Sequence, residues 1–336
     1  MQCTYLSSPW VAYSNNEVNV DLRVSPQSET LFIYQKFLLN GSYMDFLQTI
    51  ILTFQESPTF FLIYITIIGF LVGSFLNVVI YRLPVMMENE FKDEYQEYFH
   101  PEQELPERPR FNLITPRSRC PNCGHKISAW ENIPVISYLI LKGKCRGCGQ
   151  HISMRYPLVE TFTGIMTLLV AWHFGPTVQV IGALILTWSL IAASGIDFDK
   201  MLLPDEIIQP LIWIGLLFNL FNTYVSISDA IYGAVAGYMV LWLFYWTFKL
   251  CTGKEGMGYG DFKLTACLGA WFGYQMLPAI IFGSALVGAV FGGILMFINR
   301  NKESQPFAFG PYIAIMGFLV MLWGQNINNF YLDLLR

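Results

Sequence analysis

Long apolar runs recur along most of this chain and restrict its fold more than any other feature. Of its 336 residues, 54% are hydrophobic and only 13% are charged, whereas about a quarter of the residues in soluble domains are charged. Several runs reach the ~20 residues that a helix needs to cross the ~30 Å hydrocarbon core of a lipid bilayer. We therefore predict an all-α, polytopic membrane protein with about eight transmembrane segments. They lie at 59–81, 157–173, 178–196, 206–222, 229–248, 262–274, 277–298 and 307–325.

The sixth segment is short and rich in small residues, which suits either a buried helix or half of a broken helix. The basic residues indicate the orientation. Eleven of the twenty Lys and Arg residues lie in the hydrophilic stretch 82–155, whereas the turns at 174–177, 223–228 and 275–276 contain none. Because Lys and Arg accumulate in cytoplasmic loops, we predict a cytoplasmic 82–155 stretch and an external N-terminus. The net charge of −4 gives no indication of nucleic-acid binding.

The residues that precede the first run show no basic region followed by a cleavage site, so we expect no removable signal peptide. Residues 1–43 are either a true extension or lie upstream of a natural start at Met44, and we favour the start at Met44. The expected domains are an N-terminal extension at 1–57, a first span with the hydrophilic loop at 58–173, and a second membrane domain at 174–336.

Four cysteines form two CxxC pairs inside the hydrophilic stretch. Cys120 and Cys123 form the first pair, Cys145 and Cys148 form the second, and a glycine follows each pair. Four thiolates on two tight turns suit tetrahedral Zn²⁺, and a cytoplasmic location disfavours disulfides. We predict a structural zinc site in a zinc-ribbon-like module, with a redox-active pair as the alternative. The two histidines beside the pairs are expected not to be ligands, and the other three cysteines to be incidental or core thiols.

An acidic cluster interrupts the apolar sequence at the cytoplasmic end of the third segment. It contains Asp197, Asp199 and Asp205. Carboxylates at membrane depth are costly and indicate a functional site by default. Simpler explanations exist, because Asp199 beside Lys200 suits a solvated loop and Asp205 suits the N-cap of the fourth segment.

A further carboxylate, Asp261, lies at the cytoplasmic start of the sixth segment. Gly258 and Gly260 precede it and would let a substrate strand approach the backbone closely, and Lys263 follows it. Asp261 could alternatively cap the sixth segment. Because the fourth and fifth segments lead out and back, Asp197 and Asp261 are predicted to lie on the same side of the membrane at the same depth.

Two carboxylates brought together cannot both ionise readily, so one keeps a proton while the other acts as a base. An aspartic protease needs this division, because the ionised group activates water and the protonated group polarises the scissile carbonyl. A helix N-terminus and Lys263 favour charge on Asp261, whereas a helix C-terminus disfavours charge on Asp197. We hypothesise that Asp261 is the base and Asp197 the proton carrier, supported by Gly258, Gly260, Lys263 and Asp199.

Together these motifs resemble the type IV prepilin peptidase family over about residues 60–324. The resemblance includes GSFLNVVIYRLP at 73–84, WENIP at 130–134 between the CxxC pairs, RYPLVE at 155–160 and both aspartate motifs. The GYGD sequence that ends at Asp261 also resembles the GxGD signature of intramembrane aspartic proteases.

The resemblance implies a bifunctional enzyme of the bacterial inner membrane with its catalytic face in the cytoplasm. It would use Asp197 and Asp261 to cleave the basic leader from prepilins and pseudopilins of type IV pili or type II secretion. It would then methylate the new N-terminal residue with S-adenosylmethionine, an activity associated with the 58–173 part, although no motif identifies the methyl-donor site. The alternatives are a peptidase without methyltransferase activity, a proton-coupled transporter and a non-enzymatic scaffold with a zinc module.

The stretch 86–107 carries eight carboxylates and one lysine. Such a surface could attract a basic leader and raise its local concentration. A solvated loop that merely avoids the membrane surface is the alternative. We expect this stretch to be partly helical.

Overall fold

The computed structural model describes residues 49, 52–103, 105–106, 108–298 and 308–334. The chain divides into a unit at 1–53 and a unit at 54–336, and the helices described below all belong to the second unit. The predicted extension at 1–43 and the start at Met44 lie outside the described residues, as do Glu104 and Glu107 of the acidic stretch.

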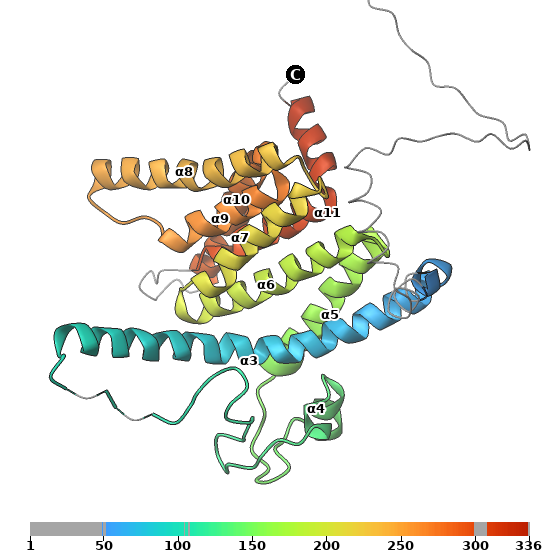
Figure 1. Ribbon diagram of the computed structural model, residues 1–336, viewed down its shortest axis with the longest axis vertical. Coiled ribbons are helices and arrows are strands. Elements are labelled where there is room, and N and C mark those ends of the chain that lie inside the picture. The colour runs from blue at the N-terminus through green and yellow to red at the C-terminus, as the bar shows by residue number, and fades with distance from the viewer. Residues whose placement is uncertain (1–48, 50–51, 104, 107, 299–307, 335–336) are drawn as a thin grey trace, which may run out of the picture. The chain divides into compact units, whose positions relative to one another are not determined.

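A helix lies at each of the eight predicted membrane segments (Figure 1). Their bounds are α3 Pro58–Phe99, α5 Arg155–Phe174, α6 Val178–Lys200, α7 Asp205–Leu220, α8 Ile227–Thr252, α9 Tyr259–Phe272, α10 Leu277–Ile298 and α11 Gly310–Leu334. The shorter elements are α4 Ile136–Ile140 and the 3-10 turns η1 Trp130–Asn132 and η2 Tyr274–Met276. The described part of the chain contains no strand, which confirms the predicted all-α class.

The number of helices long enough to cross a membrane is smaller than the number of predicted segments. Six helices of the described residues are long and apolar enough to cross a membrane. The remaining two, α7 with 16 residues and α9 with 14, are shorter than the ~20 residues of a full crossing. The predicted figure of about eight crossings is therefore not confirmed.

α3 is much longer than a bilayer crossing requires. Its 42 residues span about 63 Å at 1.5 Å per residue. The helix therefore continues from the first membrane segment into the acidic stretch, as far as Phe99. The expectation that this stretch is partly helical is confirmed.

The helices of the second unit form two groups that meet at α6. α3 and α5 pack against each other and both contact α6. On the other side, α9 packs against α7, α8 and α11, and α11 also contacts α6 and α10 (Figure 1). This arrangement brings the end of α6 beside the starts of α9 and α11.

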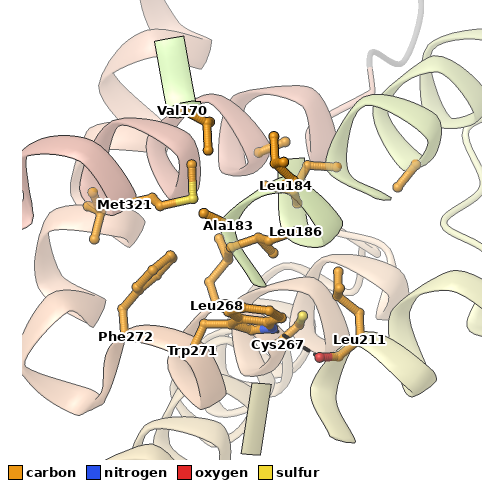
Figure 2. Packing of buried hydrophobic residues seen from close by; sticks show 14 of the residues in the cluster. Val170, Ala183, Leu184, Leu186, Leu211, Cys267, Leu268, Trp271, Phe272 and Met321 are labelled. Carbon is orange, nitrogen blue, oxygen red and sulfur yellow. Dashed lines mark hydrogen bonds between the residues drawn. The ribbon is translucent and has the colours of Figure 1, made fainter. Parts of the chain in front are cut away.

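α9, the sixth predicted segment, is a buried helix. From Asp261 to Phe272 every residue except Lys263 is buried. Trp271 lies in the main apolar cluster, and its indole N–H donates to the Leu211 carbonyl of α7 over 2.9 Å (Figure 2). Because other helices cover it, α9 can be shorter than a helix that must span lipid.

Two facing glycines let α8 and α9 approach each other closely. A Cβ on Gly269 would lie 2.1 Å from the carbonyl oxygen of Gly233, and a Cβ on Gly233 would lie 2.2 Å from the carbonyl oxygen of Gly269. Both contacts are with backbone atoms, which cannot rotate away as the end of a side chain can. The two helices would have to separate to admit a side chain at either position.

Gly269→Ala is therefore expected to lower the melting temperature of the detergent-purified protein. Overpacking a tight core costs about 1–3 kcal/mol, because the added methyl group would force α8 away from α9. Gly293→Ala in α10 is the matched control, since nothing lies within 4 Å of a Cβ there and alanine is the better helix former. Equal melting temperatures for the two variants would contradict this contact.

Candidate functional site

Asp197 lies in the last turn of α6 and is buried, with 5% of the residue exposed. Met201 ends the helix in the left-handed region, at a φ of 53°, and its N–H donates to the Asp197 carbonyl over 2.8 Å. Oδ2 of Asp197 accepts a hydrogen bond from the backbone N–H of Gly310 over 2.9 Å. Because Gly310 is the first residue of α11, the positive end of that helix points at this carboxylate.

Asp261 lies in the first turn of α9 and is also buried, with 7% exposed. Its N–H donates to the carbonyl of Gly258, which is the N-cap residue of α9. Because Gly258 is the N-cap residue, the alternative in which Asp261 is the N-cap of this helix is wrong. The charge of Asp197 acts directly on Asp261, and the two carboxyl groups are therefore within electrostatic range of each other.

Leu203 packs against both segments that approach the aspartates. A Cβ on Gly260 would lie 2.8 Å from Cβ of Leu203. A Cβ on Gly310 would lie 3.0 Å from Cδ2 of Leu203 and 2.6 Å from Oδ2 of Asp197. The two glycines thus leave room for one leucine, and the loop after α6 meets the starts of α9 and α11 there.

Two ion pairs flank the aspartates. Arg155 donates to both carboxylate oxygens of Asp199 over 2.9 and 2.5 Å, so Asp199 is more than a solvated loop charge. Lys263 donates to both oxygens of Asp205 over 2.8 and 2.7 Å. Lys263 is thus bound by Asp205 rather than by Asp261, unlike the arrangement hypothesised from the sequence. Asp205 is the first residue of α7 and not its N-cap, so the capping explanation is also wrong.

The four cysteines predicted to bind zinc lie together. Their sulfur atoms are all within 4.8 Å of one another. Cys120 Sγ lies 3.9 Å from Cys148 Sγ, and Cys123 Sγ lies 3.9 Å from Cys145 Sγ. The glycine after each pair has a positive φ, of 70° and 73°, and donates its N–H to the carbonyl of the first cysteine over 2.9 and 2.8 Å. The two knuckles therefore have the same backbone geometry.

This donor set fits a tetrahedral metal ion. Ligands about 2.3 Å from a tetrahedral Zn²⁺ lie about 3.8 Å apart, close to the two 3.9 Å separations. Backbone hydrogen bonds from Cys123 and Asn122 lower the pKa of the Cys120 thiol to about 6. Although a backbone hydrogen bond from His125 acts in the opposite direction, desolvation and the neighbouring thiols raise the pKa of Cys123 to about 12. Four thiols this close together can all be ionised only when a bound cation balances the repulsion between their negative charges.

Among the described residues, neither histidine beside the pairs belongs to the cysteine cluster. Nε2 of His125 lies 3.2 Å from Oε2 of Glu131. The same oxygen accepts the backbone N–H of Ser128 over 2.9 Å, and this hydrogen bond is the main reason that the pKa of Glu131 is lowered to about 2. The glutamate of the WENIP motif therefore ties the first knuckle to η1.

Sequence reasoning assigned no role to two charged residues that hold the hydrophilic loop between α3 and α5. Arg82 of α3 donates to the carbonyls of Asn112 and Pro116 over 2.8 and 2.6 Å. Glu160 of α5 is buried and accepts the N–H of Val135 over 2.7 Å. A charge within or directly after a predicted membrane segment is the signal that could have identified both.

A cavity of about 560 Å³ lies at the ends of the helices opposite to the ends that carry the paired aspartates. Its lining includes His173, Tyr224 and Trp323, and it includes neither Asp197 nor Asp261. His173 is in the last turn of α5, the opposite end from Arg155. This cavity is therefore separate from the paired aspartates.

Each half of the chain matches the model of a known protein family. Residues 67–174 match the bacterial peptidase A24 N-terminal domain, and this range contains all four clustered cysteines. Residues 184–293 match the type IV leader peptidase family, and this range contains Asp197 and Asp261. No solved structure matches the chain.

Curated relatives match along most of their length. A protein of Aeromonas hydrophila named prepilin leader peptidase/N-methyltransferase is 52% identical over 275 residues, which cover 82% of this chain and 95% of that protein. Proteins with the same name from Pseudomonas aeruginosa and Legionella pneumophila are 52% and 43% identical, each over 82% of this chain and over 95% and 96% of those proteins. With six membrane-capable helices, this chain is a multi-pass membrane protein. It belongs to the type IV leader peptidase family.

Proposed function

We propose that this protein is a membrane aspartic peptidase that removes the leader peptide of prepilins and pseudopilins and then N-methylates the new N-terminal residue. The names of its relatives include both activities, and both family models match. The observation that carries the peptidase proposal is the burial of two carboxyl groups, Asp197 and Asp261, within electrostatic range at neighbouring helix ends.

Asp197 and Asp261 are the proposed catalytic pair. Desolvation and mutual repulsion oppose a double negative charge, so the pair shares one proton. The ionised carboxylate takes a proton from the attacking water as its oxygen bonds to the scissile carbonyl carbon. The protonated carboxyl donates a hydrogen bond to the carbonyl oxygen, where negative charge develops. The carbonyl then re-forms as the C–N bond breaks, and the proton that the base took from water passes to the leaving amine nitrogen.

The contacts of the two carboxyl groups favour Asp197 as the base. The Gly310 N–H donates to Oδ2 of Asp197, and a backbone donor stabilises the charged form of a carboxylate. A backbone hydrogen bond from Gly258 acts on Asp261 in the same sense, but desolvation and the charge of Asp197 outweigh it. Lys263 is bound by Asp205 and adds no direct ion pair to Asp261. This assignment reverses the roles hypothesised from the sequence. The assignment names the carboxyl group that carries the negative charge before substrate binds. The two carboxyl groups share one proton and therefore titrate together.

The glycines before Asp261 have different proposed roles. Gly258 is exposed, so an extended substrate could approach its backbone without meeting a side chain. Gly260 faces Leu203, and its lack of a side chain serves packing. Asp199 and Lys263 are proposed to support the site through their ion pairs with Arg155 and Asp205.

The proposed location is the bacterial inner membrane, with the aspartates and the cysteine module on the cytoplasmic side. The concentration of Lys and Arg in 82–155 supports this orientation. S-adenosylmethionine is the proposed methyl donor, since the relatives are named N-methyltransferases. The 58–173 part is the proposed location of that activity.

Zn²⁺ is the proposed ion of the cysteine module. Cys120, Cys123, Cys145 and Cys148 would hold it and would occupy all four tetrahedral positions. A closed four-sulfur site leaves no position for water or substrate, so the ion would stabilise the loop and take no part in hydrolysis.

Asp197→Asn and Asp261→Asn are each expected to abolish leader cleavage. An amide can neither act as the base nor share the proton that the pair requires. The measurement is the conversion of a purified prepilin to its shortened product by the enzyme in detergent, followed on a gel and by mass spectrometry. Glu206→Gln is the control, because Glu206 is an exposed carboxylate in the first turn of α7.

The melting temperature of each asparagine variant shows whether it is folded. Cleavage at the wild-type rate by either folded variant would sink the assignment of the pair. A labelled methyl group on S-adenosylmethionine, added to the same wild-type reaction, separates the two-activity enzyme from the peptidase-only alternative. Label in the shortened product supports the former.

Gly310→Ala is expected to lower kcat for cleavage by roughly 100-fold, since small displacements of a catalytic group have effects of this order. The new Cβ would lie 2.6 Å from Oδ2 of Asp197 and 3.0 Å from Cδ2 of Leu203. Gly324→Ala is the matched control on the same helix, because its Cβ would meet only ordinary contacts at 3.5 Å or more. If both variants cleave prepilin equally fast, α11 does not position Asp197.

About one zinc ion per chain is expected in the purified protein by elemental analysis. Cys120→Ser and Cys145→Ser are expected to lose most of it and to melt at a lower temperature, because the hydroxyl is a poor replacement for a thiolate ligand. Cys251→Ser changes an exposed cysteine outside the cluster and should keep the metal. A metal-free wild type that forms a disulfide within this cluster would instead support the redox alternative.

A further inference from the structure

Asp199, which forms an ion pair with Arg155, lies on the same turn of α6 as the proposed catalytic residue Asp197. Two guanidinium nitrogens of Arg155 donate to the two carboxylate oxygens of Asp199, over 2.9 and 2.5 Å. Such a two-bond contact fixes direction as well as distance, because both groups are planar. Asp199 follows Asp197 by two residues on the same helical turn.

This turn of α6 needs fixing from outside. It is the last turn of the helix, and Met201 ends it in the left-handed region. The final carbonyl groups of a helix lack partners within it, and terminal turns fray. The Gly310 N–H holds the side chain of Asp197 from one side. Arg155 holds the same turn from another helix.

Arg155 is itself held in place. It is the first residue of α5. The carbonyl of the next residue, Tyr156, accepts the side-chain amide of Asn77 in α3 over 3.1 Å. One turn further, Glu160 accepts the N–H of Val135 over 2.7 Å. The start of α5 is thus bound both to α3 and to the cytoplasmic loop, and it can serve as a fixed support.

The two partners come from different halves of the chain. Arg155 lies in the range that matches the N-terminal domain model, 67–174, and Asp199 lies in the range that matches the leader peptidase model, 184–293. We propose that Arg155 is a positioning residue of the peptidase site, through which the N-terminal half orients Asp197. This inference rests on the proposed function of Asp197.

Arg155→Ala is expected to lower kcat for prepilin cleavage by about ten-fold or more, because misplacement of a catalytic group slows the chemical step. KM should stay within about two-fold, since Arg155 contacts Asp199 and is not proposed to contact substrate. The melting temperature should change little, because the pair is partly exposed, at 45% and 29%, and such pairs contribute little stability. Arg155→Lys should recover only part of kcat, since lysine cannot make the two parallel bonds.

Exchanging the charges separates positioning from a general effect of the substitution. Arg155→Asp alone should be at least as slow as Arg155→Ala, because two carboxylates then repel. Combining it with Asp199→Arg should restore kcat by several-fold over Arg155→Asp. Arg108→Ala is the matched control. It removes a pair with Asp93 of similar exposure, 34% and 38%, within the same N-terminal half, and should leave kcat unchanged.

Three results would overturn the proposal. They are wild-type kcat in Arg155→Ala, a rise in KM with no change in kcat, and no recovery in the charge-exchanged double variant. Asp197→Asn in the same assay keeps this question apart from the proposed function. An active Asp197→Asn removes the proposed function itself, whereas an inactive Asp197→Asn beside a fully active Arg155→Ala removes only the positioning role.

Discussion

The enclosure of α9 by other helices is the constraint on which the rest of this structure depends. A helix of 14 residues is too short to cross a bilayer alone, and its exposed backbone ends would be costly in hydrocarbon. Close contact with α8 at Gly233 and Gly269, and the hydrogen bond from Trp271 to α7, surround it with protein. α9 is therefore enclosed from its third residue, Asp261, which is shielded from water.

Two other helix ends lie beside the first turn of α9. α6 ends with Asp197 in its last turn, and α11 begins with Gly310, whose N–H binds that carboxylate. Leu203 packs against both Gly260 and Gly310, so a single side chain keeps the three segments in register. A buried carboxylate pair is expensive in isolation. Here the donor and the packing come from segments more than a hundred residues apart, which explains how the cost is offset locally.

Predictions that rest on local sequence patterns were confirmed, whereas contacts between distant residues were not predicted. The helix positions and the cysteine cluster were confirmed, because an apolar run of ~20 residues and a CxxC spacing act over one helix or one turn. The partner of Lys263 was not predicted, since its proximity to Asp261 in sequence does not show that Lys263 pairs with Asp205 in the fold. Gly310 and Leu203 were missed because neither residue type carries a chemical signal. The sequence pattern did not predict that the first membrane segment and the acidic stretch belong to one helix, α3, because the polar half carries no apolar signal.

The amino-acid sequence alone determined which segments are helical, which cysteines cluster, and which two carboxylates lie at the ends of apolar segments. These properties follow from hydrophobicity, ligand chemistry and short spacings, all of which are written locally. Only the tertiary structure determined that α9 is enclosed and that the Gly310 N–H donates to Asp197. It also determined that Arg155 pairs with Asp199 and that Lys263 pairs with Asp205. The partner of a charged group at a helix end depends on which helix packs beside it, and that choice is made by the whole bundle.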